Sequence, residues 1–127
     1  MHPAPIARWR AMVSSHDLAD LSDLLADDAV FQSPAVFAPQ AGKALVTKYL
    51  YAALAVLNDD SFRYTNEWVA PRSAVLEFEL EMEGVSVNGV DIIEWNEAGR
   101  ITRFKVMIRP MKALNAVVAK MGVLLAA

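Results

Sequence analysis

Residues 76–83 read Leu-Glu-Phe-Glu-Leu-Glu-Met-Glu, a strict alternation of four apolar and four acidic side chains. Successive side chains of a β-strand point to opposite faces, so a strand here places the apolar set on one face and the acids on the other. The apolar face needs a core to cover it. The acidic face is expected to be solvated or paired with opposite charge, since a run of charge is usually a wet surface. This segment therefore predicts a sheet with one buried face.

A period of two continues on both sides of this segment. It predicts three or four strands, in residues 62–70, 73–83, 85–96 and 100–109. The sequence Asn-Glu-Ala-Gly at residues 96–99 predicts a hairpin turn between the last two strands. In the last strand the cationic Arg103, Lys105 and Arg109 alternate with the apolar Phe104, Val106 and Ile108. Opposite charges could therefore lie across one face of the sheet.

The rest of the chain repeats apolar residues at intervals of three and four, which is typical of helices with one buried face. Helices are expected in residues 5–25, 42–57 and 111–126. The string Ser-His-Asp at residues 15–17 divides the first of these, and Asp17 is placed to cap a second helix that starts at Leu18. Between the helices, residues 29–33 predict a short strand that stops at Pro34. The order of elements predicts an α+β fold.

The length of 127 residues falls within the usual size of one domain, so residues 1–127 are expected to fold as a single unit. The formal charge of −3, without clustered Lys and Arg, argues against nucleic acid as a partner. Zero cysteines exclude disulfides and thiolate catalysis. The chain shows no leader-like start and no apolar run of membrane-spanning length, so no membrane partner and a cytoplasmic location are expected.

The sequence lacks the common motifs of nucleotide-binding proteins and serine hydrolases. Its five glycines form neither a phosphate-binding loop nor a dinucleotide spacing, and no serine lies in a nucleophile elbow. The two histidines, His2 and His16, lie in the terminal segment and in a helix-breaking string. Consecutive Ser, His and Asp residues do not form a triad, which is defined by geometry. Neither a metal site nor a cofactor is expected.

Asp91 is the candidate for chemistry, because alternation places its carboxylate in an apolar row. That row consists of Val87, Gly89, Asp91, Ile93 and Trp95. Burying a carboxylate costs free energy unless it is paired or protonated, and desolvation raises its pKa towards the range useful for general acid–base catalysis. The alternative is a structural acid that is bound to a backbone N–H or to an arginine at the sheet edge.

The order of elements resembles the nuclear transport factor 2-like superfamily, which includes ketosteroid isomerases, polyketide cyclases and limonene epoxide hydrolases. The similarity covers nearly the whole chain. It is carried by Asp17-Leu18, the segment 24–31 (Leu-Leu-Ala-Asp-Asp-Ala-Val-Phe), Gly42, Asp91 and the segment 96–101 (Asn-Glu-Ala-Gly-Arg-Ile). The resemblance implies a cone-shaped, strongly curved, mostly antiparallel sheet that is backed by N-terminal helices, encloses an apolar pocket and is followed by a C-terminal helix.

Aligned with the ketosteroid isomerases, this chain keeps one polar group of their site. Ser33 stands where those enzymes have their catalytic aspartate, Trp9 stands for the oxyanion-hole tyrosine, and Leu50 stands for a supporting tyrosine. Asp91 matches the second oxyanion donor, a carboxylic acid that an apolar site keeps protonated. Serine without a neighbouring base cannot abstract the proton, so the ketosteroid isomerase mechanism is not expected. The similarity to polyketide cyclases instead implies Asp91 as both acid and base.

Two hypotheses follow. The first is a cofactor-independent isomerase or cyclase that acts on an apolar carbonyl or cyclic metabolite. Asp91 is its acid and base, Trp9 Nε1 or Ser33 Oγ its hydrogen-bond donor, and its pocket walls are Phe31, Trp68, Phe78 and Trp95. The second is a non-catalytic domain that binds a small apolar molecule or dimerises. The charged sheet face and the apolar last helix both favour a homodimer.

Overall fold

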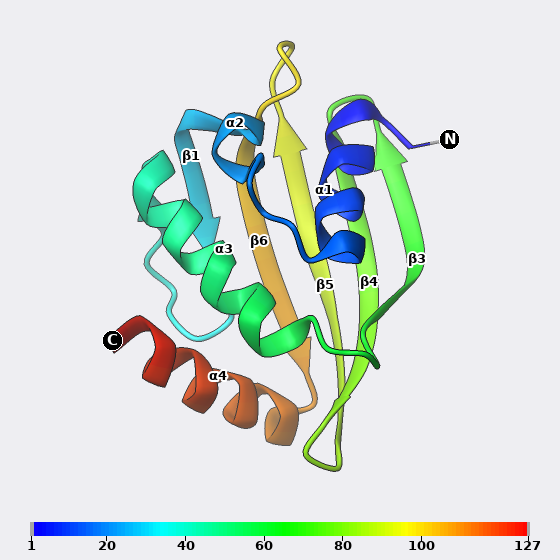
Figure 1. Cartoon of the computed structure of the whole chain (residues 1–127), viewed down its shortest axis with the longest axis vertical. Helices are drawn as coiled ribbons and strands as arrows, with labels where there is room; N and C mark the ends of the chain where they lie inside the picture. Colours follow the sequence, from blue (N-terminus) through cyan, green and yellow to red (C-terminus); the bar gives the residue numbers. More distant parts are fainter. Residues whose placement is uncertain (1, 127) are drawn as a thin grey trace.

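The structure is a computed structural model that describes residues 2–126, and its strands form one six-stranded sheet (Figure 1). The strands are β1 (Leu25–Gln32), β2 (Gln40–Ala41), β3 (Arg63–Ala70), β4 (Ser73–Met82), β5 (Val85–Trp95) and β6 (Ile101–Arg109). Their order across the sheet is β2-β1-β6-β5-β4-β3. Strand β1 runs parallel to β6, and the other neighbouring pairs are antiparallel. The predicted mostly antiparallel sheet is confirmed.

The alternation in β4 has the predicted consequence. Leu76, Phe78 and Leu80 are at most 1% exposed and belong to the core. The acids point to the other face, where Glu77 accepts hydrogen bonds from two asparagine side chains and Glu79 pairs with Arg63 at 2.8 Å. Partners on that face satisfy the carboxylates while the opposite face excludes water.

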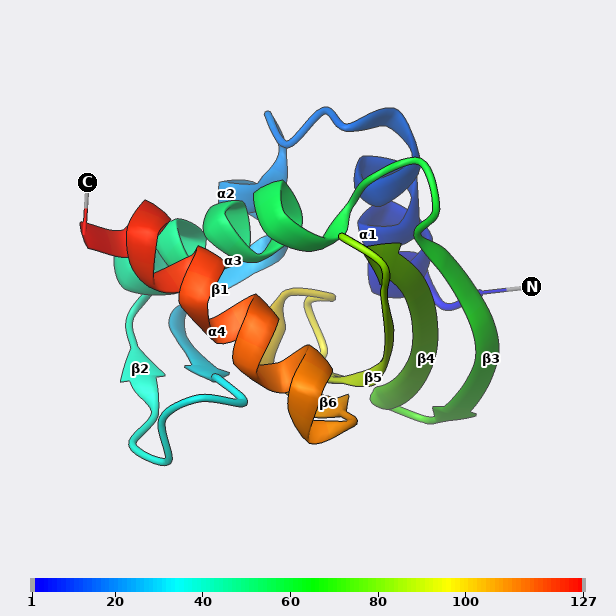
Figure 2. The same ribbon diagram turned by 90° about the horizontal axis from the view of Figure 1, so that it is seen from below.

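The helices cover the concave face of the sheet. They are α1 (Ala4–Ser15), α2 (Leu21–Leu24), α3 (Lys43–Leu57) and α4 (Met111–Ala126). Figure 1 shows α1 and α3 in front of the sheet, with α4 crossing its lower end. Figure 2, viewed from below, shows the sheet curving around this helical layer. The predicted α+β fold, with a curved sheet and helices at both ends of the chain, is confirmed.

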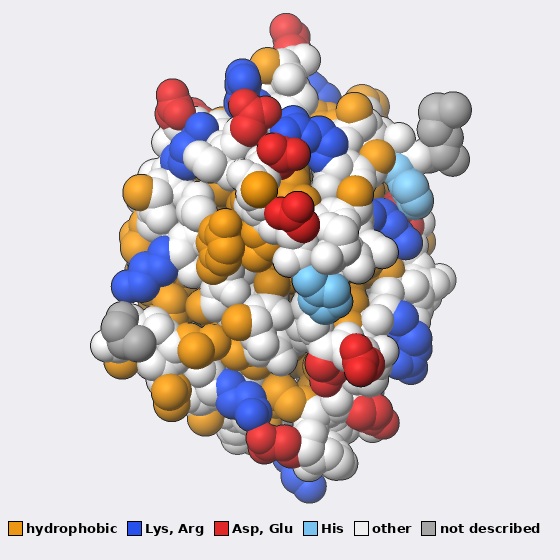
Figure 3. All heavy atoms as spheres, in the orientation of Figure 1, with side chains coloured by type: hydrophobic (Ala, Val, Ile, Leu, Met, Phe, Trp, Pro, Cys, Tyr) orange, Lys and Arg blue, Asp and Glu red, His pale blue; other side chains and the backbone are white. Residues whose placement is uncertain are grey.

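Helix α4 follows β6 as predicted, but it is only loosely covered. Of its side chains, Ala113 and Val117 are buried, whereas Met111 and Val123 are 77% and 73% exposed. Apolar side chains also gather at the surface over α3 and α4 (Figure 3). No helix within residues 2–126 is long and apolar enough to cross a membrane.

The segment after α1 differs from the sequence prediction. A long second helix from Leu18 is wrong: Asp17 Oδ1 accepts from the Ala19 N–H at 3.0 Å, and helix α2 has only four residues. The chain is already extended at Leu25, which pairs with Ile101 of β6. The apolar residues just before Leu25 fit a helix or a strand equally well. Pairing with the distant strand β6 decides that the chain is extended from Leu25 onwards.

Candidate functional site

Asp91 lies in the middle of the sheet on its concave face. It is 6% exposed, and it is the one charged side chain buried among residues 2–126. Its neighbours across the strands are Leu76 in β4 and Val106 in β6. The alternation in β5 therefore holds, and it places a carboxyl group in the apolar interior.

The carboxyl group of Asp91 is the acceptor at the end of a chain of hydrogen bonds. Tyr64 Oη donates to Asp91 Oδ2 at 2.6 Å, and Trp9 Nε1 donates to Tyr64 Oη at 2.8 Å. Residues from α1, β3 and β5 thus converge on one buried point. The indole N–H of Trp9, expected from the sequence to serve a ligand, is instead used by Tyr64.

Burial controls the ionisation of both Asp91 and Tyr64. Desolvation raises the pKa of Asp91 to about 7, while the hydrogen bond from Tyr64 acts in the opposite direction. Desolvation, and after it the charge of Asp91, raises the pKa of Tyr64 well above its ordinary value. Tyr64 is therefore a neutral donor near neutral pH, and Asp91 can exchange a proton there, which is the property required of a general acid or base.

A charged cluster connects Tyr64 to the surface. The Arg10 guanidinium lies 5.0 Å from the centre of the Tyr64 ring, a cation–π distance. Arg10 also pairs with Glu67 at 3.2 Å, and Glu67 binds His2 Nδ1 at 2.7 Å. These contacts fix the outer side of the Tyr64 ring.

Tyr64 was not predicted as a site residue, and one irregularity in β3 decides the directions of both Tyr64 and Trp68. The pairing of β3 with β4 shifts between Tyr64 and Asn66, which reverses the alternation. Tyr64 lies opposite Phe78 and faces the core, whereas Trp68 lies opposite Val75 and is 56% exposed. Trp68 therefore lies on the outer face of the sheet, away from the face that holds Asp91. Tyr64 was part of a predicted strand, but the bulge that decides its direction left no signal in the sequence.

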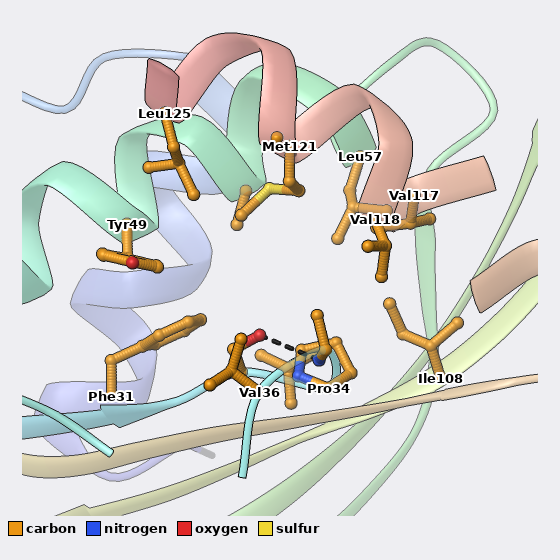
Figure 4. Close-up of a pocket in the computed structure, with 15 residues that line it drawn as sticks. Phe31, Pro34, Val36, Tyr49, Leu57, Ile108, Val117, Val118, Met121 and Leu125 are labelled. Atoms are coloured by element: carbon orange, nitrogen blue, oxygen red, sulfur yellow. Dashed lines mark hydrogen bonds between the residues drawn. The ribbon is translucent and has the colours of Figure 1, made fainter. Parts of the chain in front are cut away.

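An apolar cavity of about 190 Å³ lies between α3, α4, the ends of β1 and β6, and the loop after β1 (Figure 4). It is lined by Phe31, Ser33, Pro34, Ala35, Val36, Tyr49, Ala53, Leu57, Val106, Ile108, Val117, Val118, Met121, Gly122 and Leu125. None of these residues is charged. The side-chain polar groups among them are the hydroxyls of Ser33 and Tyr49.

Apart from Trp68, the residues predicted for the site fall into two places. Phe31 and Ser33 line the cavity. Trp9, Phe78 and Trp95 are buried in the core and are not part of the cavity lining. Asp91 does not line the cavity either. Val106 does, and it lies directly opposite Asp91 in the sheet, so it is a wall residue next to the carboxyl group.

Apart from Asp91, the positions aligned with the ketosteroid isomerase site carry no acidic or basic side chain. Ser33 Oγ accepts from the Ala35 N–H at 2.9 Å, which leaves its own proton free to donate. Leu50 is 1% exposed and belongs to the core. Residues 2–126 contain no group of three or more His, Asp or Glu side chains arranged to hold a metal ion.

Residues 6–104 match the SnoaL-like domain family. A steroid delta-isomerase from Pseudomonas aeruginosa is 38% identical, with 97% of this chain and 90% of that chain covered and a TM-score of 0.92. A protein with a cystatin-like fold from Silicibacter pomeroyi is 32% identical, with 97% and 85% covered and a TM-score of 0.86.

A SnoaL-like polyketide cyclase structure from Shewanella putrefaciens shares the fold at 14% identity, with 93% and 87% covered and a TM-score of 0.67. A comparison with curated proteins gives no match.

Proposed function

Because the chain belongs to the SnoaL-like domain family, within the nuclear transport factor 2-like superfamily, we propose that it binds a small apolar molecule in the cavity between α3 and α4. One observation carries the proposal: a cavity of about 190 Å³ with no charged residue in its lining opens beside the loosely covered helix α4. Ligand sites are typically apolar hollows with a few polar groups that fix orientation, and the hydroxyls of Ser33 and Tyr49 fit that description.

Binding is placed before catalysis because of how the concave face is packed. Leu76 and Val106, which lie opposite Asp91 in the neighbouring strands, are at most 5% exposed, so side chains fill the interior around the carboxyl group. Other residues of the same face are also buried, namely Leu80, Met82, Ile93 and Phe104. The hollow lies on the other side of Val106. A ligand in this cavity therefore meets hydroxyls and apolar walls before it meets the carboxyl group.

The cavity can be tested with two matched substitutions in α4. Val118 lines the cavity, whereas Val123 is 73% exposed and does not. Val118→Phe is expected to weaken calorimetric binding of 2-naphthol by about tenfold or more, because the larger ring occupies space that the ligand needs. Val123→Phe is expected to leave binding unchanged. Equal binding by both variants, or no binding of 2-naphthol by the unaltered protein, would reject this site.

A second candidate function is cofactor-independent isomerisation or cyclisation of a carbonyl compound. Two features of Asp91 favour this function. Its pKa is about 7, and the Tyr64 hydroxyl holds its carboxyl group in position. Asp91 would remove a proton from the carbon next to the carbonyl, the C–H electron pair would form the enolate, and the protonated acid would return a proton to another carbon. The steroid delta-isomerase at 38% identity supports a reaction of this class.

Proton exchange measures this step without knowledge of the natural substrate. A bicyclic ketone such as 1-tetralone is incubated with the protein in D₂O, and loss of its α-proton signal is followed by NMR. Catalysed exchange that disappears in Asp91→Asn, with binding of the ketone retained, is the expected result. Equal exchange in the variant and the unaltered protein would remove Asp91 from the chemistry.

A further inference from the structure

The residues that line the cavity restrict the size, the charge and the polar groups of a ligand, in addition to requiring that it be apolar. We propose that its ligand is an uncharged molecule of one or two rings with a single hydroxyl or carbonyl group. This inference rests on the proposed binding function. It is argued from the size of the cavity, from the absence of charge among its lining residues and from the positions of its aromatic and hydroxyl groups.

Size sets the upper limit. The cavity measures about 190 Å³. A dry engineered cavity of roughly 150 Å³ holds benzene, and sites for drug-sized ligands run from roughly 300 Å³ upward. The space therefore suits one ring, or two fused rings. A four-ring skeleton would extend out of this hollow unless side chains of α4, such as Met121, move away from it (Figure 4).

Charge on the ligand is excluded by what surrounds the cavity. None of the lining residues carries a charge, so an ionised ligand would lose its hydration without gaining a counter-ion. The nearest charged group established for the interior is Asp91, directly across the strands from Val106. A carboxylate or phosphate in the cavity would have this acid behind Val106 and no base in the lining. An anionic ligand is therefore disfavoured.

The remaining groups select for a ring with one polar substituent. Phe31 and Tyr49 lie at one end of the cavity, with ring centres 5.7 Å apart and planes at 39° (Figure 4). Such tilted aromatic walls favour another ring over a flexible chain. Ser33 Oγ already accepts from Ala35, so its proton can be donated to a ligand oxygen. The Tyr49 hydroxyl forms no hydrogen bond with residues 2–126, and it is the second group available to a single oxygen.

The charge rule can be tested with two probes that share one skeleton. At about pH 7, 2-naphthol is neutral and 2-naphthoate is ionised. Calorimetry is expected to show 2-naphthol binding at least about tenfold more tightly than 2-naphthoate. Equal affinity for the two probes would overturn the neutral-ligand inference while leaving the cavity itself supported. Failure of 2-naphthol to bind would instead reject the cavity as a site, together with the inference.

The size rule has its own pair of variants. Met121 lines the cavity, and Met111 lies in the same helix with 77% exposure and outside the lining. The three-ring neutral probe 9-phenanthrol is expected to bind the unaltered protein and Met111→Ala at least about tenfold more weakly than 2-naphthol does. Met121→Ala should restore its affinity, since the truncation enlarges the hollow. Tight binding of 9-phenanthrol to the unaltered protein would overturn the size limit.

Discussion

Tyr64 donates a hydrogen bond of 2.6 Å to Asp91 across the intervening strand β4. This contact links an edge strand of the sheet to its centre. It also gives the buried carboxyl group a polar partner, without which burial would be more costly. Three side chains, Trp9, Tyr64 and Asp91, therefore behave as one unit, and a change in one should be felt by the others.

Removing the Tyr64 hydroxyl is expected to raise the pKa of Asp91 above its present value of about 7, because the hydrogen bond from Tyr64 favours the ionised form. Tyr64→Phe should also lower the free energy of unfolding by roughly 1–3 kcal/mol, since it leaves the Trp9 N–H and the carboxyl group without partners. Carboxyl carbon NMR titration and urea denaturation measure the two effects.

Tyr51→Phe is the matched control for this substitution. The Tyr51 hydroxyl donates to the Leu18 carbonyl at 3.2 Å from a side chain that is 46% exposed. Its loss should change the stability by less than about 1 kcal/mol and leave the titration of Asp91 as it is. A Tyr64→Phe protein with an unshifted Asp91 titration would show that the hydrogen bond is not formed in solution.

Stability is expected to decrease with rising pH because of Asp91. Its pKa is raised from 3.8 to about 7 in the folded chain, so the folded chain keeps a proton that the unfolded chain has already lost. The contribution is fully present below about pH 4 and is lost as the pH rises through about 7, with a full magnitude of roughly 4 kcal/mol.

Asp91→Asn isolates this effect from the other carboxylates. An amide can accept the Tyr64 hydrogen bond and does not ionise, so the difference in unfolding free energy between the two proteins should track Asp91 alone. The unaltered protein should lose stability relative to Asp91→Asn between about pH 4 and pH 7. Parallel stability curves across this range would mean that Asp91 titrates normally.

Two glycines give opposite expectations for substitution by alanine. A Cβ at Gly89 would lie 2.5 Å from both the Met107 carbonyl oxygen and Phe78 Cζ. Gly89→Ala should therefore lower the unfolding free energy by about 1–3 kcal/mol or more, through overpacking of the strand pair. Gly122 lies within α4 and has nothing within 4 Å of that position. Gly122→Ala should raise stability by about 0.5–1 kcal/mol. Thermal denaturation of both variants tests the pair, and equal effects would contradict the packing described for β5.

Much of the fold followed from the period of the apolar residues. The alternation in residues 76–83 predicted both faces of β4, and the same rule placed Asp91 in the interior. These successes share a cause, because the direction of a side chain in a regular strand depends only on its place in the sequence. Helix α4 was likewise predicted from its own periodicity and begins and ends where expected.

The remaining features depend on contacts between distant segments. The direction of Tyr64 is decided by the register shift between β3 and β4, and the early start of β1 by the pairing of Leu25 with Ile101. The position of the cavity depends on how α4 packs beside α3, so that Val118 and Met121 line the same hollow as Phe31 (Figure 4). None of these relationships is periodic, and each requires the three-dimensional arrangement to be known.

The homodimer expected from the sequence stays a prediction, and the outer face of the sheet is where a second copy should bind. Glu94 and Arg103 form a 3.4 Å pair on that face, and Met107, further along β6 on the same face, is 50% exposed. A two-fold axis packs the same face of two copies together. Because this face carries both acids and bases, the acids of one copy can pair with the bases of the other around an apolar centre. Sedimentation velocity at micromolar concentration should show a dimer. Met107→Glu should shift it to monomer, while Met111→Glu, on the exposed side of α4, should not. A monomer in the unaltered protein would refute this arrangement.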